Sequence, residues 1–163
     1  MPTPTAVADL TTRLSRAGFI AAEEEANELL ARAAGDGVLL DSLVARRLTG
    51  EPLAWIIGKV SFCGVEVRVD PGVYVPRWQT EPLARRAVER LPATGVAIDL
   101  CTGSGAIART LSTYRPDARV VASDIDEGAV ACAAANGVEV YRGDLFAPLS
   151  LIHISEPTRQ AEI

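Results

Sequence analysis

The residues best suited to chemistry lie where predicted strands end. The run from Asp99 to Ala106 joins an apolar strand to a helix and contains Thr102, Gly103 and Gly105. Glycine allows tight turns and close approach of the backbone, and the free N–H groups at a helix start carry partial positive charge. The run therefore predicts an anion-binding loop, although an ordinary strand-to-helix turn would leave the same pattern.

Acidic residues follow the next two predicted strands. Asp124 closes the second strand, and its carboxylate could accept two hydrogen bonds from a ribose diol. Asp144 and Leu145 follow the third strand, where a carboxylate could accept a hydrogen bond from an adenine amino group. For Asp144 alone, a turn or a helix cap is the alternative. Ligands of such folds bind at the carboxyl ends of the strands, so the three sites together predict one nucleoside-binding pocket.

The spacing from the loop to Asp124 also fits a dinucleotide site. The loop itself disfavours that alternative, because Cys101 stands where the first glycine of Gly-x-Gly-x-x-Gly would be. Ile107 and Ala108 then follow without a further glycine. A nicotinamide-dependent oxidoreductase thus remains a weaker alternative.

Helices and strands must position these sites, and the spacing of the apolar residues predicts where these elements lie. Helical spacing covers the first fifty residues, with a third helix begun by Asp41 or Ser42. Alternation from Val65 to Val69 predicts a strand, paired with residues 73–75 through a turn at Pro71-Gly72. The expected helices of the whole chain are 6–16, 21–34, 39–48, 81–91, 106–114 and 126–135, and the expected later strands are 95–100, 119–123 and 138–141.

This order predicts an α/β fold in three parts. Residues 1–58 are expected to form a small helical bundle, residues 59–78 a linking β-hairpin, and residues 79–149 a partial domain. Strand–helix repeats of this length imply parallel pairing with right-handed crossovers. The last part is thus the first half of a doubly wound, Rossmann-like sheet.

Composition narrows the class of protein. The chain has 163 residues and a net charge of −5, with 16 basic residues that form no stripe suited to nucleic acid. No apolar run approaches a membrane span, and the N-terminus lacks the pattern of a signal peptide. Three separated cysteines give neither a disulfide framework nor a zinc spacing, so we expect a cytoplasmic protein without a metal site.

Two stretches resemble the release factor N(5)-glutamine methyltransferases, the HemK-type family. The first runs from Arg47 to Glu81 and contains Gly50-Glu51-Pro52 and the run Pro76-Arg77-Trp78-Gln79-Thr80-Glu81. The second is the loop from Asp99 to Ala108. The runs occur in the family's order and spacing, and the resemblance covers roughly residues 20–149.

The resemblance implies a Rossmann-like methyltransferase that uses S-adenosyl-L-methionine as cofactor. It implies methylation of a glutamine side-chain nitrogen in a peptide-chain release factor, which would be the partner. It also implies that the helical residues 1–58 form a substrate-recognition domain. Its site residues fall on the following positions: Thr102, Gly103, Gly105 and Asp99 at the methionine end, Asp124 at the ribose, Asp144 and Leu145 at the adenine, and Arg77, Thr80 and Glu81 along the pocket border. An ion pair of Arg77 with Glu81 and a helix cap at Thr80 are the alternatives there.

The chain departs from the family's pattern at several points. Cys101 stands where glycine is frequent, Gln79 replaces an acidic residue, and Trp78 is bulky for its place. The family's Asn-Pro-Pro-Tyr motif, whose oxygens orient the amide nitrogen, is absent. The last residues, 150–163, resemble a translated sequencing adapter rather than the family, so His153 is not interpreted as catalytic.

We therefore expect a C-terminally truncated methyltransferase with no catalytic residues of its own and little activity. One alternative is a methyltransferase for another protein, a nucleic acid or a small molecule. A second alternative is a non-catalytic binding module in which the helical part binds a partner and the pocket is vestigial.

Overall fold

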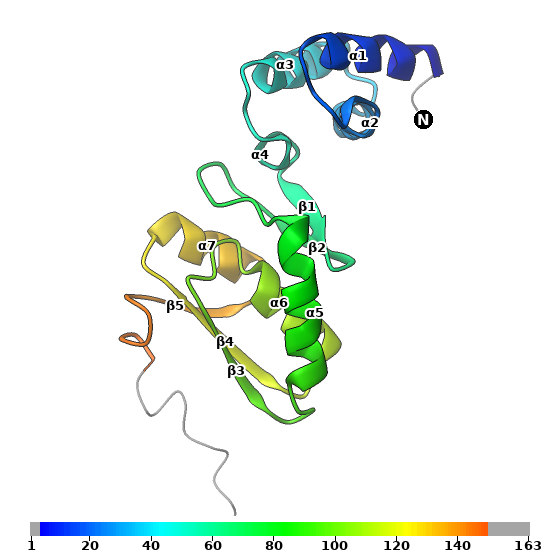
Figure 1. Cartoon of the computed structure of the whole chain (residues 1–163). Helices are drawn as coiled ribbons and strands as arrows, with labels where there is room; N and C mark the ends of the chain where they lie inside the picture. Colours follow the sequence, from blue (N-terminus) through cyan, green and yellow to red (C-terminus); the bar gives the residue numbers. More distant parts are fainter. Residues whose placement is uncertain (1–3, 150–163) are drawn as a thin grey trace, which may run out of the picture. The chain divides into compact units, whose positions relative to one another are not determined.

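The structure is a computed structural model that describes residues 4–149. The expected foreign tail, residues 150–163, lies outside this range. The chain divides into two compact units, Met1–Gly58 and Lys59–Ile163. Each unit is coloured by sequence in Figure 1, the first in blue to cyan and the second in green to orange.

The first unit is helical. Its core consists of buried side chains that recur at helical spacing, including Leu14, Ala26, Leu29 and Val44. The elements are α1 (Pro4–Arg16), α2 (Ala22–Ala33), α3 (Gly37–Leu48) and α4 (Leu53–Ile57).

Two details of this unit differ from the sequence prediction. Helix α3 begins after Asp36, whose side chain accepts a hydrogen bond from the backbone N–H of Leu39 at 3.0 Å. The predicted starts at Asp41 and Ser42 are wrong because Asp36 already supplies the cap one turn earlier. The helix α4 was not predicted, since five residues are too few to display a period.

The second unit opens with an antiparallel hairpin of β1 (Lys59–Phe62) and β2 (Val65–Arg68). Its turn is Cys63-Gly64, with φ of 53° and 79°, which is the two-residue geometry that matches the twist of a hairpin. The predicted partner strand at residues 73–75 is wrong: this segment is a loop. The turn lies before Val65, so the partner of β2 precedes it in the chain.

The rest of the unit is a three-stranded parallel sheet in the order β3-β4-β5, which confirms the predicted fold class. Buried side chains of α6, β4 and α7 share one core, so both helices cover the same face (Figure 1). The elements are η1 (Trp78–Thr80), α5 (Glu81–Arg90), β3 (Val96–Leu100), α6 (Ala106–Tyr114), β4 (Arg119–Asp124), α7 (Glu127–Ala135) and β5 (Glu139–Arg142).

The helical unit also contains a nearly buried ion pair. The guanidinium of Arg47 donates to the Glu25 carboxylate through Nε at 2.6 Å and Nη2 at 2.9 Å. The two side chains are 14% and 12% exposed. Arg47 also donates to the Glu51 carbonyl at 2.9 Å and lies 3.9 Å from the centre of the Phe19 ring. A single cation thus joins α2, α3 and the segment before α4.

Glu25→Ala is expected to lower the free energy of unfolding of the helical unit by about 3 kcal/mol, because it leaves Arg47 partly buried without its counter-charge. Urea unfolding measures the change, followed by the fluorescence of Trp55 in a Trp78→Phe background, because Trp78 lies in the other unit. The control is Glu24→Ala, which removes an exposed carboxylate of the same helix and should change stability by less than about 0.5 kcal/mol. Equal effects of the two variants would show that the Glu25 pair adds nothing beyond a surface contact.

Candidate functional site

The loop between β3 and α6 holds an unusual backbone conformation. Cys101, Gly103 and Gly105 all lie in the left-handed region, with φ of 56°, 59° and 80°. The loop is fixed at two points, because the Thr102 N–H donates to the Ser123 carbonyl at 3.1 Å and the Gly105 N–H donates to the Thr102 carbonyl at 2.9 Å. The first bond fastens the loop to the end of the neighbouring strand β4.

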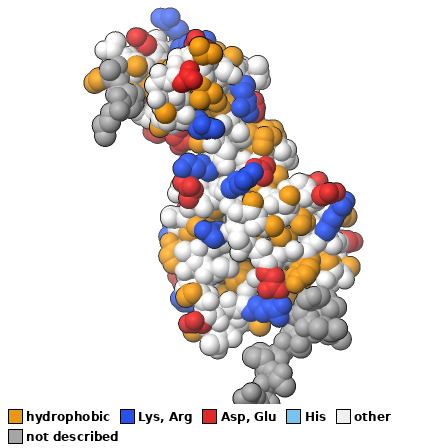
Figure 2. Space-filling view, turned by 180° about the vertical axis from the view of Figure 1, so that it is seen from behind, with side chains coloured by type: hydrophobic (Ala, Val, Ile, Leu, Met, Phe, Trp, Pro, Cys, Tyr) orange, Lys and Arg blue, Asp and Glu red, His pale blue; other side chains and the backbone are white. Residues whose placement is uncertain are grey.

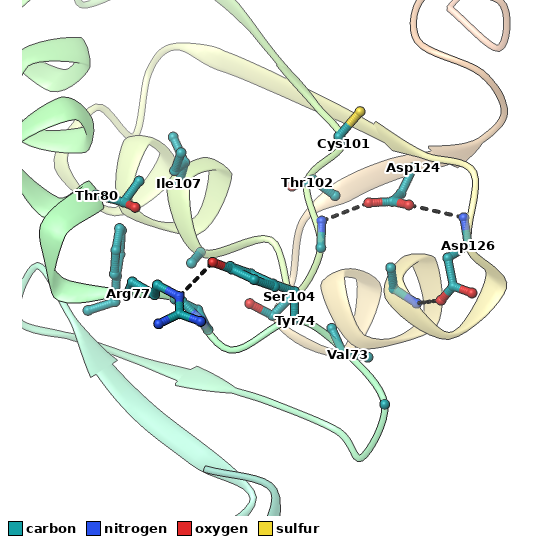
Figure 3. A pocket seen from close by; sticks show the side chains of 16 residues that line it. Val73, Tyr74, Arg77, Thr80, Cys101, Thr102, Ser104, Ile107, Asp124 and Asp126 are labelled. Atoms are coloured by element: carbon teal, nitrogen blue, oxygen red, sulfur yellow. Dashed lines mark hydrogen bonds between the residues drawn. The ribbon is translucent and has the colours of Figure 1, made fainter. Parts of the chain in front are cut away.

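Asp124 is the acidic group at the end of β4. One carboxylate oxygen accepts from the Gly103 N–H at 2.8 Å and the other accepts from the Asp126 N–H at 3.0 Å (Figure 3). Each carboxylate oxygen can accept more than one hydrogen bond, so a ligand hydroxyl could still donate to this group. Asp124 is half-buried and forms part of a pocket wall.

The pocket has a volume of about 350 Å³, which is within the range of small-molecule sites. Its wall consists of Phe62 of the hairpin, residues 72–80, the loop with the start of α6, Asp124 at the end of β4, and the start of α7. Of the predicted site residues, it brings together Arg77, Thr80, Thr102, Gly103 and Asp124. The polar edge of a ligand would thus meet Asp124 and the loop, and its remainder would meet residues 72–80.

Asp99 lies under the loop and is not among the residues that line the pocket. Its carboxylate accepts from the Thr102 hydroxyl at 2.6 Å and from the Ala108 N–H at 3.2 Å. Loss of surrounding water raises the pKa of the Asp99 carboxyl, and these two hydrogen bonds act in the opposite direction. Through these two contacts Asp99 holds the loop to the first turn of α6.

Other predicted site residues also lie outside the pocket wall. A Cβ on Gly105 would lie 3.0 Å from the Ala133 Cβ, so this glycine allows the loop to pack on α7. Glu81 pairs with Arg85 at 3.1 Å and not with Arg77. Asp144 and Leu145 are exposed beyond β5 and are not part of this pocket.

The end of β5 nevertheless adjoins Asp124. The Gly143 N–H donates to the Asp124 carbonyl at 2.9 Å, and the Ser123 hydroxyl donates to the Leu145 carbonyl at 2.7 Å. The segment that carries Asp144 is thereby fastened beside the pocket. A ligand that extends past Asp124 would meet this segment.

The sequence analysis did not identify several pocket residues. Tyr74 accepts a hydrogen bond on its hydroxyl from Arg77 Nε at 2.7 Å, and Asp126 caps α7 by accepting from the Ala129 N–H at 2.8 Å (Figure 3). The Asp126 cap has a recognisable sequence signal, an acidic residue just before a predicted helix. The alternative cap at Thr80 is wrong, because Thr80 is in helical conformation and its side chain makes no capping bond.

No group of three or more His, Cys, Asp or Glu side chains that could hold a metal ion is found among residues 4–149. Within the same residues, no helix is long and apolar enough to cross a membrane. Figure 2 shows acidic and basic side chains interspersed on this face of each unit, without a continuous patch of one sign.

Comparison with known proteins identifies the relatives of the chain. No family model matches it. A release factor glutamine methyltransferase from Mycobacterium leprae is 37% identical over 90% of this chain, and one from Corynebacterium glutamicum is 34% identical over 97%. The chain is a homologue of the release factor glutamine methyltransferases. One from Neisseria gonorrhoeae is 46% identical over 61% of the chain.

The homology extends over only part of each methyltransferase. The alignments cover 58% of the M. leprae protein, 61% of the C. glutamicum protein and 37% of the N. gonorrhoeae protein. Among solved structures, a ribosomal protein L11 methylase from Lactobacillus delbrueckii subsp. bulgaricus matches 52% of this chain and 47% of its own, with 26% identity and a TM-score of 0.43. The homology to release factor glutamine methyltransferases thus rests on the sequence relatives.

The backbone of Cys101 generates a prediction about stability. A residue with a Cβ in the left-handed region is strained, and glycine is not. Cys101→Gly is therefore expected to raise the free energy of unfolding by about 1 kcal/mol, measured by urea unfolding. Cys101→Ala removes the exposed thiol but keeps the Cβ, so it should give no such gain. Equal gains in both variants would assign the effect to the thiol and contradict the role of the backbone.

Proposed function

We propose that the second unit binds S-adenosylmethionine in the pocket beside Asp124, as a homologue of the release factor glutamine methyltransferases. The observation that carries the proposal is the pairing of Asp124 with the Gly103 N–H at 2.8 Å in the pocket wall. This pair places a hydroxyl acceptor and a glycine loop at one point, where the adjacent ends of β3 and β4 meet.

Each part of S-adenosylmethionine has a chemically suitable partner among these residues. The free lone pairs of Asp124 suit the two hydroxyls of a ribose, and the loop around Thr102 and Gly103 suits the carboxylate of a methionine. Asp144 and Leu145, fastened beside Asp124 by the contacts of their segment, are our assignment for the adenine. Arg77 and Thr80 also line the pocket, and we propose that the methyl acceptor enters beside them.

When bound, S-adenosylmethionine would supply an electrophilic methyl group, and we propose that the acceptor is a glutamine side chain of a peptide-chain release factor. An amide nitrogen is a weak nucleophile, so its orientation is a main task of such an enzyme. The sequence contains no Asn-Pro-Pro-Tyr motif for that task. We therefore propose that these 163 residues bind the cofactor and transfer little or no methyl group, in the cytoplasm, where free thiols persist.

Titration of the purified chain with S-adenosylmethionine by calorimetry tests the binding site. We expect saturable binding to one site, weakened at least about tenfold in Asp124→Ala because the carboxylate bonds are lost. Asp124→Asn keeps the shape and one acceptor oxygen and should fall between the two. Asp117→Ala removes an exposed acidic residue outside the pocket and serves as the control. Unchanged affinity in a folded Asp124→Ala variant would contradict the assignment.

A separate assay tests the expected lack of transfer. The chain is incubated with methyl-labelled S-adenosylmethionine and a glutamine-bearing release factor, and label in the release factor is counted. We expect no label above a reaction without the chain. A full-length relative, such as the M. leprae protein, is the positive control. Turnover by the chain would show that glutamine orientation does not depend on the motif.

A further inference from the structure

Asn136 is a buried polar residue directly after α7, outside the pocket. The residue is only 7% exposed. The Oδ1 atom accepts from the Arg68 N–H at 2.8 Å, and Nδ2 donates to the Arg68 carbonyl at 2.9 Å and to the Ser104 carbonyl at 2.8 Å. Two carbonyl oxygens face Nδ2, so only this orientation of the amide is compatible with its surroundings.

The two bonds with Arg68 imitate the pairing of a neighbouring strand. Both backbone groups of the last residue of β2 are satisfied by one side-chain amide rather than by another strand. The third bond reaches a different segment, because Ser104 belongs to the glycine loop. Asn136 therefore connects the hairpin, the end of α7 and the loop within the second unit.

The bond to Ser104 falls at the point where the loop most needs support. Ser104 lies between Gly103, whose N–H binds Asp124, and Gly105, and both glycines have left-handed φ values. Glycine has more conformational freedom than any other residue, so a loop with glycine on both sides of Ser104 can rotate that peptide unless a contact fixes it. The Asn136 amide supplies a contact of this kind. The contact is shielded from water, because Ser104 is only 2% exposed.

We propose that Asn136 is a positioning residue for cofactor binding, which holds the glycine loop so that Gly103 faces Asp124. The proposal rests on the proposed function for its effect on affinity. Without the anchor, the binding-competent loop is only one of several conformers, and apparent affinity falls with its population. Asn136 does not itself line the pocket, so it acts through Ser104, which does, and through the neighbouring Gly103.

Cys132 offers a matched control on the same helix. Its buried thiol also contacts the Arg68 carbonyl, at 3.4 Å, but it has no hydrogen bond to the loop. Cys132→Ala thus weakens the contact with the hairpin and leaves the Ser104 bond in place. A loss of stability common to both variants is structural, and an effect confined to Asn136 variants belongs to the loop.

The experiment combines amide hydrogen exchange, read by NMR on the full chain without ligand, with calorimetric titration by S-adenosylmethionine. Asn136→Ala is expected to speed exchange at Gly103 and Gly105 and to raise Kd by about tenfold or more. Cys132→Ala should leave both unchanged at a temperature where each variant is folded. Asn136→Asp retains the size and the acceptor for the Arg68 N–H but cannot donate to Ser104 when ionised, so it should behave like Asn136→Ala.

Unchanged exchange at both glycines in folded Asn136→Ala, or an equal change in Cys132→Ala, would overturn the proposal. If the unmodified chain fails to bind S-adenosylmethionine while exchange at the loop still responds to Asn136→Ala, the proposed function fails and the positioning role stands. If neither Asn136 variant folds, two NMR measurements on the unmodified chain test the proposal. Slow exchange of the Asn136 side-chain amide and a coupling through its hydrogen bond to the Ser104 carbonyl support the proposal, and their absence overturns it.

Discussion

The candidate site depends on one hydrogen bond, from the Gly103 N–H to the Asp124 carboxylate. It forms because β3 and β4 are parallel and in a register that pairs Leu100 with Ser123, so the loop after β3 meets Asp124, the last residue of β4. The bond orients a backbone donor, fixes a carboxylate that can still accept, and defines one wall of the pocket. The remaining features of the site act to hold these two groups in place.

Three further hydrogen bonds hold the loop in place around this bond. The Asp99 carboxylate accepts from the Thr102 hydroxyl, the Ser123 carbonyl accepts from the Thr102 N–H, and the Asn136 side chain donates to the Ser104 carbonyl. A tight left-handed loop exposes many backbone groups, and each of them must find a partner where water is excluded.

The sequence predicted the parts of this arrangement that leave a periodic or local signal. The parallel sheet followed from alternating strands and helices, and Asp124 was identified from its place at the end of a strand. The hairpin turn at Cys63-Gly64 was missed because Pro71-Gly72 gave a stronger turn signal, although the left-handed pair forms the turn. The role of Asn136 could not be predicted, since its partners Arg68 and Ser104 lie 68 and 32 positions away in the chain.

An amide methyltransferase must perform two tasks: it binds the methyl donor, and it orients the amide nitrogen of the acceptor. All residues that line the pocket fall between Phe62 and Ala129, and they come from the hairpin, residues 72–80, the loop with the start of α6, the end of β4 and the start of α7. Orientation of a weakly nucleophilic amide requires acceptors for its two hydrogens. Among the side chains that line the pocket, Arg77 is a cation without an acceptor and Thr80 supplies a single hydroxyl oxygen. Ligand binding and methyl transfer therefore make separate demands on the sequence, and the proposed cofactor site concerns only the first of them.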